Sequence, residues 1–202
     1  MDRRTYEYLL GVYLGDGTPY NKYGIKITTA EDGYRDVLMK LMQSLEPRLG
    51  RGKETCHRIY AGLAKNPCDH MFVPFKKNFY WLHLPKLKHP EEFVAGVFDT
   101  DGSIRKRKWT KKDTYEIMIY QKRRENLIKI AKIMEPLLIY PALRRVGTKD
   151  KVMFYLDITH PTQMKIFAKQ IPSRHPRKKT ILRECENYGP YYAAKHRDCQ
   201  TG

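Results

Sequence analysis

The chain has 202 residues, of which 41% are hydrophobic, so it can bury the core of one large domain or of two small ones. It carries 39 Lys and Arg against 22 Asp and Glu, and the formal charge of +17 favours nucleic acid as a partner before an anionic membrane surface. No apolar run is long enough to span a bilayer, and the N-terminus lacks the apolar region of a signal peptide. We therefore expect a soluble intracellular protein that has no membrane role.

The first half of the sequence predicts helices that alternate with strands. Thr5 is a suitable N-cap for a helix that ends near Gly15. Turn-forming residues occupy 18–22, and the alternating apolar and polar residues of 24–28 are typical of a half-buried strand. The remaining candidates in this half are an amphipathic helix over 33–45, strands around 56–63 and 70–75, and an aromatic-rich helix over 78–84.

The second half repeats this plan after a linker at 85–89. Pro90 and the two glutamates after it favour a helix start, and residues 127–136 resemble residues 38–47. The other predicted elements are strands over 115–120, 143–146 and 152–158, a turn at 147–150, a helix over 161–170 and a last helix from about 179. The order helix, hairpin, helix, hairpin, helix thus occurs twice, which is an α+β pattern.

Two stretches stand at equivalent places in these halves: Leu9–Gly17 (LLGVYLGDG) and Val94–Gly102 (VAGVFDTDG), separated by 85 residues. Such a period indicates an internal repeat. Both stretches are apolar on nearly every side, as buried helices are. Small residues recur four apart in each, so one face of each helix lets another backbone approach closely.

Each stretch ends in Asp-Gly, at Asp16 and Asp101, and we expect each glycine to take the left-handed conformation of a helix C-cap. A carboxylate in the last turn is disfavoured by the helix dipole. If the helices pair in parallel, the two aspartates also repel each other, and a divalent cation bound by both would relieve both costs. One such helix would be an ordinary buried helix that ends in a turn, but the repetition of the pattern favours a metal site.

The two stretches resemble the LAGLIDADG motif of homing endonucleases, in the single-chain form that has two repeats. The resemblance covers nearly the whole chain and is weakest in the last fifteen or so residues. It implies an α+β fold of two αββαββα repeats, residues 1–88 and 89–202, related by a pseudo-twofold axis and packed through the motif helices. Their antiparallel sheets would form a saddle that binds DNA. The sixth motif position is Asp99 in the second copy but Leu14 in the first.

This resemblance implies a monomeric, site-specific endonuclease that needs no protein partner and makes a staggered double-strand cut in a long, imperfectly palindromic DNA. The cut would cross the minor groove and leave 3′ overhangs. Asp16 and Asp101, with the carbonyls of Gly15 and Thr100, would hold Mg²⁺, and Mn²⁺ or Ca²⁺ could substitute in binding. Bound metal supports the in-line attack of water on a phosphodiester.

The resemblance also implies a residue that orders water at each scissile phosphate and a basic residue on a later strand of each half. Gln121 and Lys122 match the first of these in the second half, whereas residues 28–32 offer no match, so the two sites should be unequal. The candidates for the basic residues are Lys86 or Lys88 in the first half and Arg174 or Lys178 in the second.

Residues 105–112 hold six cations directly after the second aspartate. A charge run is usually a solvated surface. Beside a predicted cleavage site, we instead favour DNA contact, because a two-stranded ribbon fits the major groove. The candidate DNA contacts are Lys26, Thr28, Arg105, Lys106, Arg107, Lys108, Trp109, Lys111, Lys112, Arg144 and Arg145.

The four cysteines leave their chemistry open. They would be free thiols in an ordinary cytosol, whereas a hyperthermophilic, archaeal source would favour the bridges Cys56–Cys68 and Cys185–Cys199. A zinc set formed by the first pair with His57 and His70 is the least favoured possibility, because the spacing matches no finger signature.

Two other functions remain open for the same fold. One is an RNA maturase that assists intron splicing, and the other is a DNA-binding regulator that has lost catalysis. No intein splice junction is present in the sequence, which favours an intron-encoded protein, cytoplasmic or, in a eukaryote, organellar.

Overall fold

The computed structural model of the chain describes residues 2–21, 24–29, 31–45, 58–62, 84, 86–109, 112–148 and 151–187. The strand predicted at 70–75, nearly all of the helix predicted at 78–84, and Cys56, Cys68 and Cys199 lie outside these ranges. Within them, none of the helices has the length and apolar character needed to cross a bilayer.

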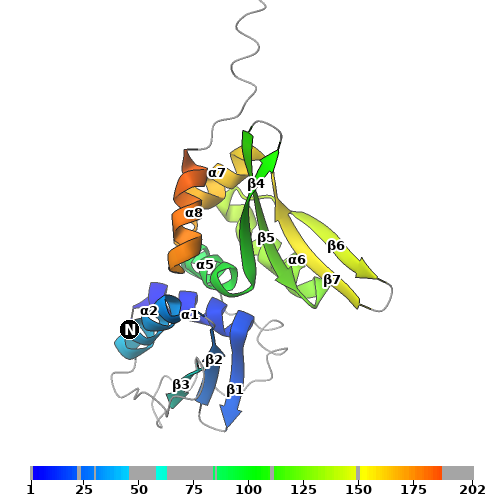
Figure 1. Cartoon of the computed structure of the whole chain (residues 1–202). Coiled ribbons are helices and arrows are strands. Elements are labelled where there is room, and N and C mark those ends of the chain that lie inside the picture. The colour runs from blue at the N-terminus through cyan, green and yellow to red at the C-terminus, as the bar shows by residue number, and fades with distance from the viewer. Residues whose placement is uncertain are drawn as a thin grey trace, which may run out of the picture.

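Helices α1 (Arg3–Asp16) and α5 (Pro90–Asp101) lie side by side at the centre of the molecule (Figure 1). Their contacts are reciprocal. A methyl group on Gly11 would overlap the carbonyl O of Phe93 and lie 3.1 Å from Cα of Gly96. A methyl group on Gly96 would likewise overlap the carbonyl O of Tyr8 and lie 3.1 Å from Cα of Gly11. Since Phe93 follows Tyr8 by the same 85 residues, the parallel pair has local twofold symmetry.

The start of α1 differs from the prediction. Its N-cap is Asp2, whose carboxylate accepts hydrogen bonds from the backbone N–H groups of Arg4 and Thr5 at 3.1 Å each. Thr5 therefore lies inside the first turn, and its hydroxyl donates to Asp2 at 2.5 Å. Aspartate and threonine are both accepted N-caps, so the sequence alone did not decide between them.

The glycines that end α1 and α5 are not left-handed, contrary to the prediction. Gly17 has φ −71° and ψ 148°, and Gly102 has φ −86° and ψ 155°, so both are extended. The reason for glycine is steric. A methyl group would overlap Tyr13 at the first position and Phe98 at the second. In both halves the backbone can thus pass directly from the motif helix into a strand.

The first sheet has the order β1-β2-β3, formed by β1 (Gly17–Asn21), β2 (Gly24–Thr28) and β3 (Arg58–Gly62), and every pair is antiparallel. The turn predicted at 18–22 is mostly strand β1. Proline is tolerated there because β1 is an edge strand. Helix α2 (Asp32–Leu45) is confirmed, and it packs on α1 through buried Tyr34 and Leu38.

The second sheet has the order β4-β5-β7-β6. Its strands are β4 (Gly102–Trp109), β5 (Lys112–Gln121), β6 (Ala142–Thr148) and β7 (Lys151–Ile158). One face carries buried Ile104, Ile117 and Leu156 and packs on α6 (Arg124–Met134) and α7 (Pro161–Gln170). The short 3₁₀ helix η1 (Glu135–Leu137) follows α6. We call the other side of the sheet the open face. The order αββαββα predicted for this half is confirmed.

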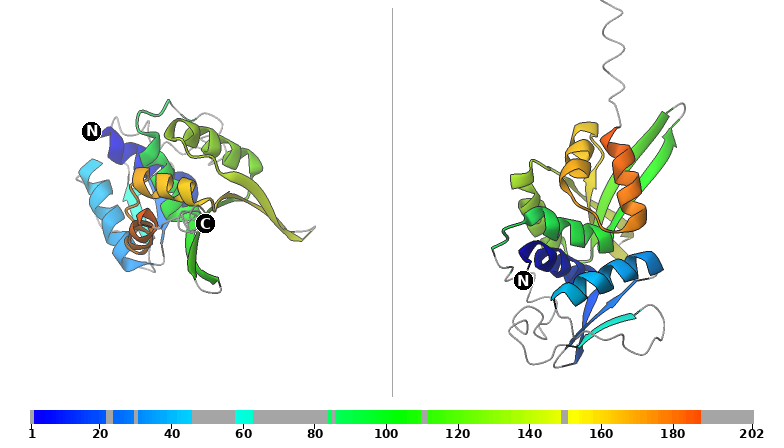
Figure 2. Two further views of the ribbon diagram at one scale, coloured as in Figure 1. Left: turned by 90° about the horizontal axis from the view of Figure 1, so that it is seen from above. Right: turned by 90° about the vertical axis from the view of Figure 1, so that its left-hand side faces the viewer.

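The last described helix, α8 (Pro176–Glu186), begins three residues before the predicted start. It lies beside α5 and reaches α2 (Figure 2). Cys185 on this helix is a fully buried free thiol, and burial raises its pKa to about 12. The bridge considered between Cys185 and Cys199 is therefore not formed at Cys185.

Candidate active site at the ends of the paired helices

The two motif aspartates are brought to one end of the helix pair. Because α1 and α5 run parallel, their last turns lie together, and a methyl group on Gly15 would be 3.2 Å from Oδ2 of Asp101. The carboxylate of Asp101 thus lies against the residue that precedes Asp16. Asp16 is exposed and Asp101 is half-buried, so both carboxylates stand at the surface of this end.

These residues fit a hard divalent cation. Among the described residues, no cluster of three or more Asp, Glu, His or Cys side chains could enclose a metal. Two carboxylates, with the last-turn carbonyls of Gly15 and Thr100 nearby, are instead the kind of partial oxygen site that Mg²⁺ completes with water and substrate phosphates.

Gln121 is joined directly to this end. Its side-chain Nε2 donates to Oδ2 of Asp101, and Asn126 Nδ2 lies 3.5 Å from its Oε1. Gln121 is the last residue of β5, and the exposed Lys122 follows it. In the first half, Thr29 is buried and its hydroxyl accepts from the backbone N–H of Glu31 at 3.3 Å, so its role is local.

Two predicted catalytic cations belong to segments that are bound near the starts of the motif helices. Lys86 lies in the linker before α5. The carboxylate of Glu7 holds this linker, because it accepts hydrogen bonds from the backbone N–H groups of Lys88 at 2.9 Å and His89 at 2.6 Å. Glu7 precedes Asp16 by nine residues, about 13 Å along a helix. The guanidinium of Arg174 binds Glu92 at 2.8 Å, and Glu92 precedes Asp101 by the same nine residues.

Lys178, the alternative to Arg174, does reach the end of α5. Its Nζ donates to the carbonyls of Phe98 and Asp99 at 2.8 Å each, and its side chain is buried. Burial lowers its pKa to about 8, against the opposing effect of Asp99, Asp16 and Asp101. A cation therefore lies among the acidic residues of both motifs.

Asp99, for which the sequence predicted no role, is the centre of a buried network. Its carboxylate accepts from Tyr8 Oη at 2.7 Å, Ser173 Oγ at 2.5 Å, and the backbone N–H groups of Arg174 at 2.7 Å and His175 at 3.1 Å. Burial raises its pKa, although these hydrogen bonds act to lower it. The partners lie more than seventy residues away in sequence, so no local pattern pointed to them.

The predicted DNA contacts are divided between the two faces of the second sheet. Arg105 is exposed on the open face, where its charge acts on Tyr120. Arg144 pairs with Tyr155 in register on the same face, and its Nε is 3.6 Å from Oδ2 of Asp157. Lys106 lies on the opposite face, with its Nζ 3.6 Å from Oε2 of Glu184 on α8.

The other predicted contacts are placed by their strands alone. Arg145 alternates with Arg144 and pairs with Phe154, so it lies on the side of the helices. The remaining residues are Lys26 and Thr28 on β2, Arg107, Lys108 and Trp109 at the end of β4, Lys112 at the start of β5, and Lys111, which lies outside the described residues.

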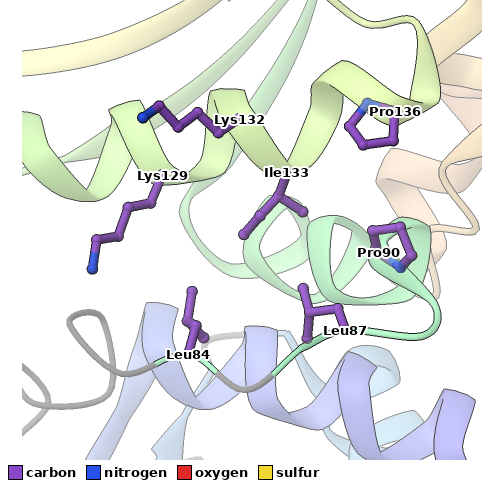
Figure 3. Close-up of a pocket in the computed structure, with 7 residues that line it drawn as sticks. All are labelled: Leu84, Leu87, Pro90, Lys129, Lys132, Ile133 and Pro136. Carbon is purple, nitrogen blue, oxygen red and sulfur yellow. The ribbon is translucent and has the colours of Figure 1, made fainter.

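A pocket of about 420 Å³ lies elsewhere, between α6 and the linker that precedes α5 (Figure 3). Leu84, Leu87 and Ile133 line it, with Lys129 and Lys132 from α6. None of the predicted site residues belongs to its lining. The candidate active site is thus an exposed end of two helices, which suits a substrate as large as a duplex.

Residues 89–172 match the family model of the LAGLIDADG-like domain, and no curated protein matches the sequence. The fold is similar to that of a variant of I-DmoI in complex with its target DNA in the presence of Mg, with TM-score 0.60, 17% identity, and 86% of this chain and 98% of that chain covered. It is also similar to I-DmoI in complex with DNA and Ca, with TM-score 0.59, 16% identity and coverage of 92% and 98%.

A third similar structure is the N-terminal LAGLIDADG domain of DUF199/WhiA, with TM-score 0.55, 16% identity and coverage of 85% and 82%. The family match identifies a LAGLIDADG-like domain in the second half of the chain, which contains one of the two motif helices and the second sheet. The fold of the chain as a whole is similar to that of I-DmoI.

Proposed function

We propose that this protein is a site-specific DNA endonuclease of the homing type. The observation that carries the proposal is the parallel pairing of α1 and α5, which brings Asp16 and Asp101 to one end. Structures of I-DmoI, which shares the fold, contain target DNA and divalent metal. Those complexes support DNA as the partner here and Mg²⁺ as the cofactor.

Asp16 and Asp101 would hold the metal, with the carbonyls of Gly15 and Thr100. Bound there, a divalent cation neutralises the charge that develops on the phosphodiester and lowers the pKa of a bound water. Gln121, fixed to Asp101, orients a water beside one scissile phosphate. Lys178 adds positive charge beside the same motif.

The two sheets would lie in the major groove on either side of the cut, and a single chain would span the whole target. Arg105 and Arg144 contact DNA from the open face, Arg107, Lys108, Trp109 and Lys112 act from the ends of β4 and β5, and Lys26 and Thr28 act from β2. Cleavage across the minor groove leaves 3′ overhangs. An intron that carries the reading frame would be its genetic context.

The test is cleavage of a duplex that spans the uninterrupted insertion site of the reading frame, with Mg²⁺ and with EDTA. We expect a staggered double-strand cut that requires the metal. A duplex with the same bases in scrambled order serves as the control for site specificity. The proposal would be rejected if none of the flanking sequences were cleaved with either Mg²⁺ or Mn²⁺.

A DNA-binding regulator without cleavage is the second candidate, because the fold is also that of the DUF199/WhiA LAGLIDADG domain. The presence of both motif aspartates favours the nuclease. Specific binding of duplex in the same assay without cleavage of either strand would favour the regulator.

A further inference from the structure

The segment that precedes α8 is attached to the end of α5 by one carboxylate. Asp99 accepts the backbone N–H groups of Arg174 and His175 and the hydroxyl of Ser173, all within 3.1 Å. Asp99 is 2% exposed, so water cannot take its place as the hydrogen-bond acceptor for these donors. The loop conformation at 173–175 therefore depends on this side chain.

The corresponding segment of the first half is attached at the opposite end of its helix. Each segment ends in the same pattern, a basic residue followed by histidine and proline. The pattern is Lys88-His89-Pro90 in the first half and Arg174-His175-Pro176 in the second. In the first, the N–H groups of Lys88 and His89 bind Glu7, near the start of α1. Leu14, which stands where Asp99 does, is fully buried and offers no acceptor.

This difference decides which segment packs against the last turns of each motif helix. Because Asp99 is two residues before Asp101, the segment that it holds delivers the first turn of α8 to the end of α5. Lys178 in that turn then binds the carbonyls of Phe98 and Asp99. In the first half, the linker cations remain near Glu7, about nine residues from Asp16.

The segment is also braced from the first half. His175 stacks on Tyr34 with ring centroids 4.7 Å apart, and its Nε2 lies 3.3 Å from Oε2 of Glu31. Tyr34 Oη is 3.0 Å from Tyr8 Oη, which itself donates to Asp99. Asp99 thus has partners that fix the segment against α1, α2 and α5 together.

We propose that Asp99 is a positioning residue for one of the two cleavage centres, which acts by holding Ser173–His175 so that the ammonium of Lys178 stays on the carbonyls of Phe98 and Asp99, in the last turns of α5. Among the described residues of the first half, no carboxylate holds a segment in this way at the end of α1, because Leu14 stands where Asp99 does. The proposal rests on the proposed endonuclease function and assigns a strand-specific role within it.

The test follows each strand of a doubly end-labelled target separately under single-turnover conditions. Asp99→Leu, which copies the first repeat, should slow one strand by at least about tenfold, the scale of losing one preorganised electrostatic contact, and leave the other within about twofold. Lys178→Met should slow the same strand. The double variant should be no slower on that strand than the slower single variant, because both changes remove the same positioned ammonium group.

Leu127→Ala on α6 is the matched control, since it truncates a fully buried side chain of the same half without touching the segment. If Asp99→Leu does not fold, Asp99→Asn and Ser173→Ala, which weaken the same junction, replace it with the same expectation. Equal slowing of both strands, or independent effects of Asp99 and Lys178, would overturn the proposal. A wild-type protein that cuts neither strand would reject the proposed function and this inference with it.

Discussion

Gln121 donates a hydrogen bond from its side-chain amide to Oδ2 of Asp101, which joins the end of β5 to the end of α5. This contact holds an amide group beside the carboxylate. The first half has Thr28, Thr29 and Ala30 at the corresponding place, none of which has a side-chain amide. The two motif aspartates therefore stand in different surroundings.

Gln121→Ala should slow cleavage of one strand in preference to the other, because only one aspartate loses its amide partner. A difference of 1.4 kcal/mol between the two barriers would make the rates differ about tenfold, so a nicked intermediate should accumulate, most visibly at limiting Mg²⁺. A time course with each strand end-labelled measures both rates. Equal loss on both strands would show that Gln121 does not serve a single centre.

Asp16→Asn and Asp101→Asn should each abolish double-strand cleavage while the affinity for DNA stays within a few-fold. The substitution removes a negative ligand from the metal but leaves the residues on the sheets unchanged. Cleavage assays with Mg²⁺ and gel-shift titrations with Ca²⁺ separate the two properties. Cleavage of both strands by either variant at close to the wild-type rate would show that the metal assignment is wrong.

The open face of the second sheet should contribute to the salt dependence of DNA binding. Arg105→Ala and Arg144→Ala should each reduce the slope of log affinity against log salt by about one, through the loss of counterion release. Lys106→Ala is the control on the same hairpin, because Lys106 faces Glu184 of α8. A smaller slope for Lys106→Ala than for Arg105→Ala would place the DNA on the other face of the sheet.

The helix pair was predictable from the sequence because the motif repeats at a fixed period and carries glycines at the positions of closest contact. Strand alternation within 105–112 could also have separated Arg105 from Lys106, but which face is covered depends on α8, far along the chain. The extended conformations of Gly17 and Gly102 were missed because Asp-Gly is compatible both with a left-handed cap and with an immediate strand.

The role of Asp99 could not be predicted for a different reason. A single acid in an apolar helix indicates only that some partner must exist, and here the donors include two backbone N–H groups that any sequence supplies. The choice between Arg174 and Lys178 likewise needed the start of α8, which the structure places at Pro176. Backbone partners and helix register are tertiary properties, so they became visible only in the folded chain.

Gly96→Ala should destabilise the fold, because the added methyl group would overlap the backbone of α1 at Tyr8. Overpacking of this kind typically costs about 1–3 kcal/mol, and the free energy of unfolding in urea measures it. Gly33→Ala on α2 is the control, since its methyl group would lie 3.7 Å from Cγ of Pro176, an ordinary contact. We expect that variant to be neutral or up to about 1 kcal/mol more stable. Equal stability of both variants would contradict the close approach of α1 and α5.

Lys178 should make the stability of the protein rise with pH above about 8. Burial lowers its pKa from 10.5 to about 8, so between these values the unfolded state binds more protons than the folded state. The free energy of unfolding therefore increases with pH between about 8 and 10.5. Below about pH 8 the folded state carries the full cost of burying the charged ammonium. The increase amounts to at most about 3 kcal/mol for this group.

The measurement is the free energy of unfolding in urea from pH 7 to pH 10.5 for the wild type and for Lys178→Met. The methionine variant should lose the part of the rise that belongs to Lys178, so the difference between the two proteins changes in favour of the wild type as the pH increases. Lys179→Met, at the exposed neighbour, should follow the wild-type profile. Parallel profiles for the wild type and Lys178→Met would show that Lys178 is not buried as a cation at the end of α5.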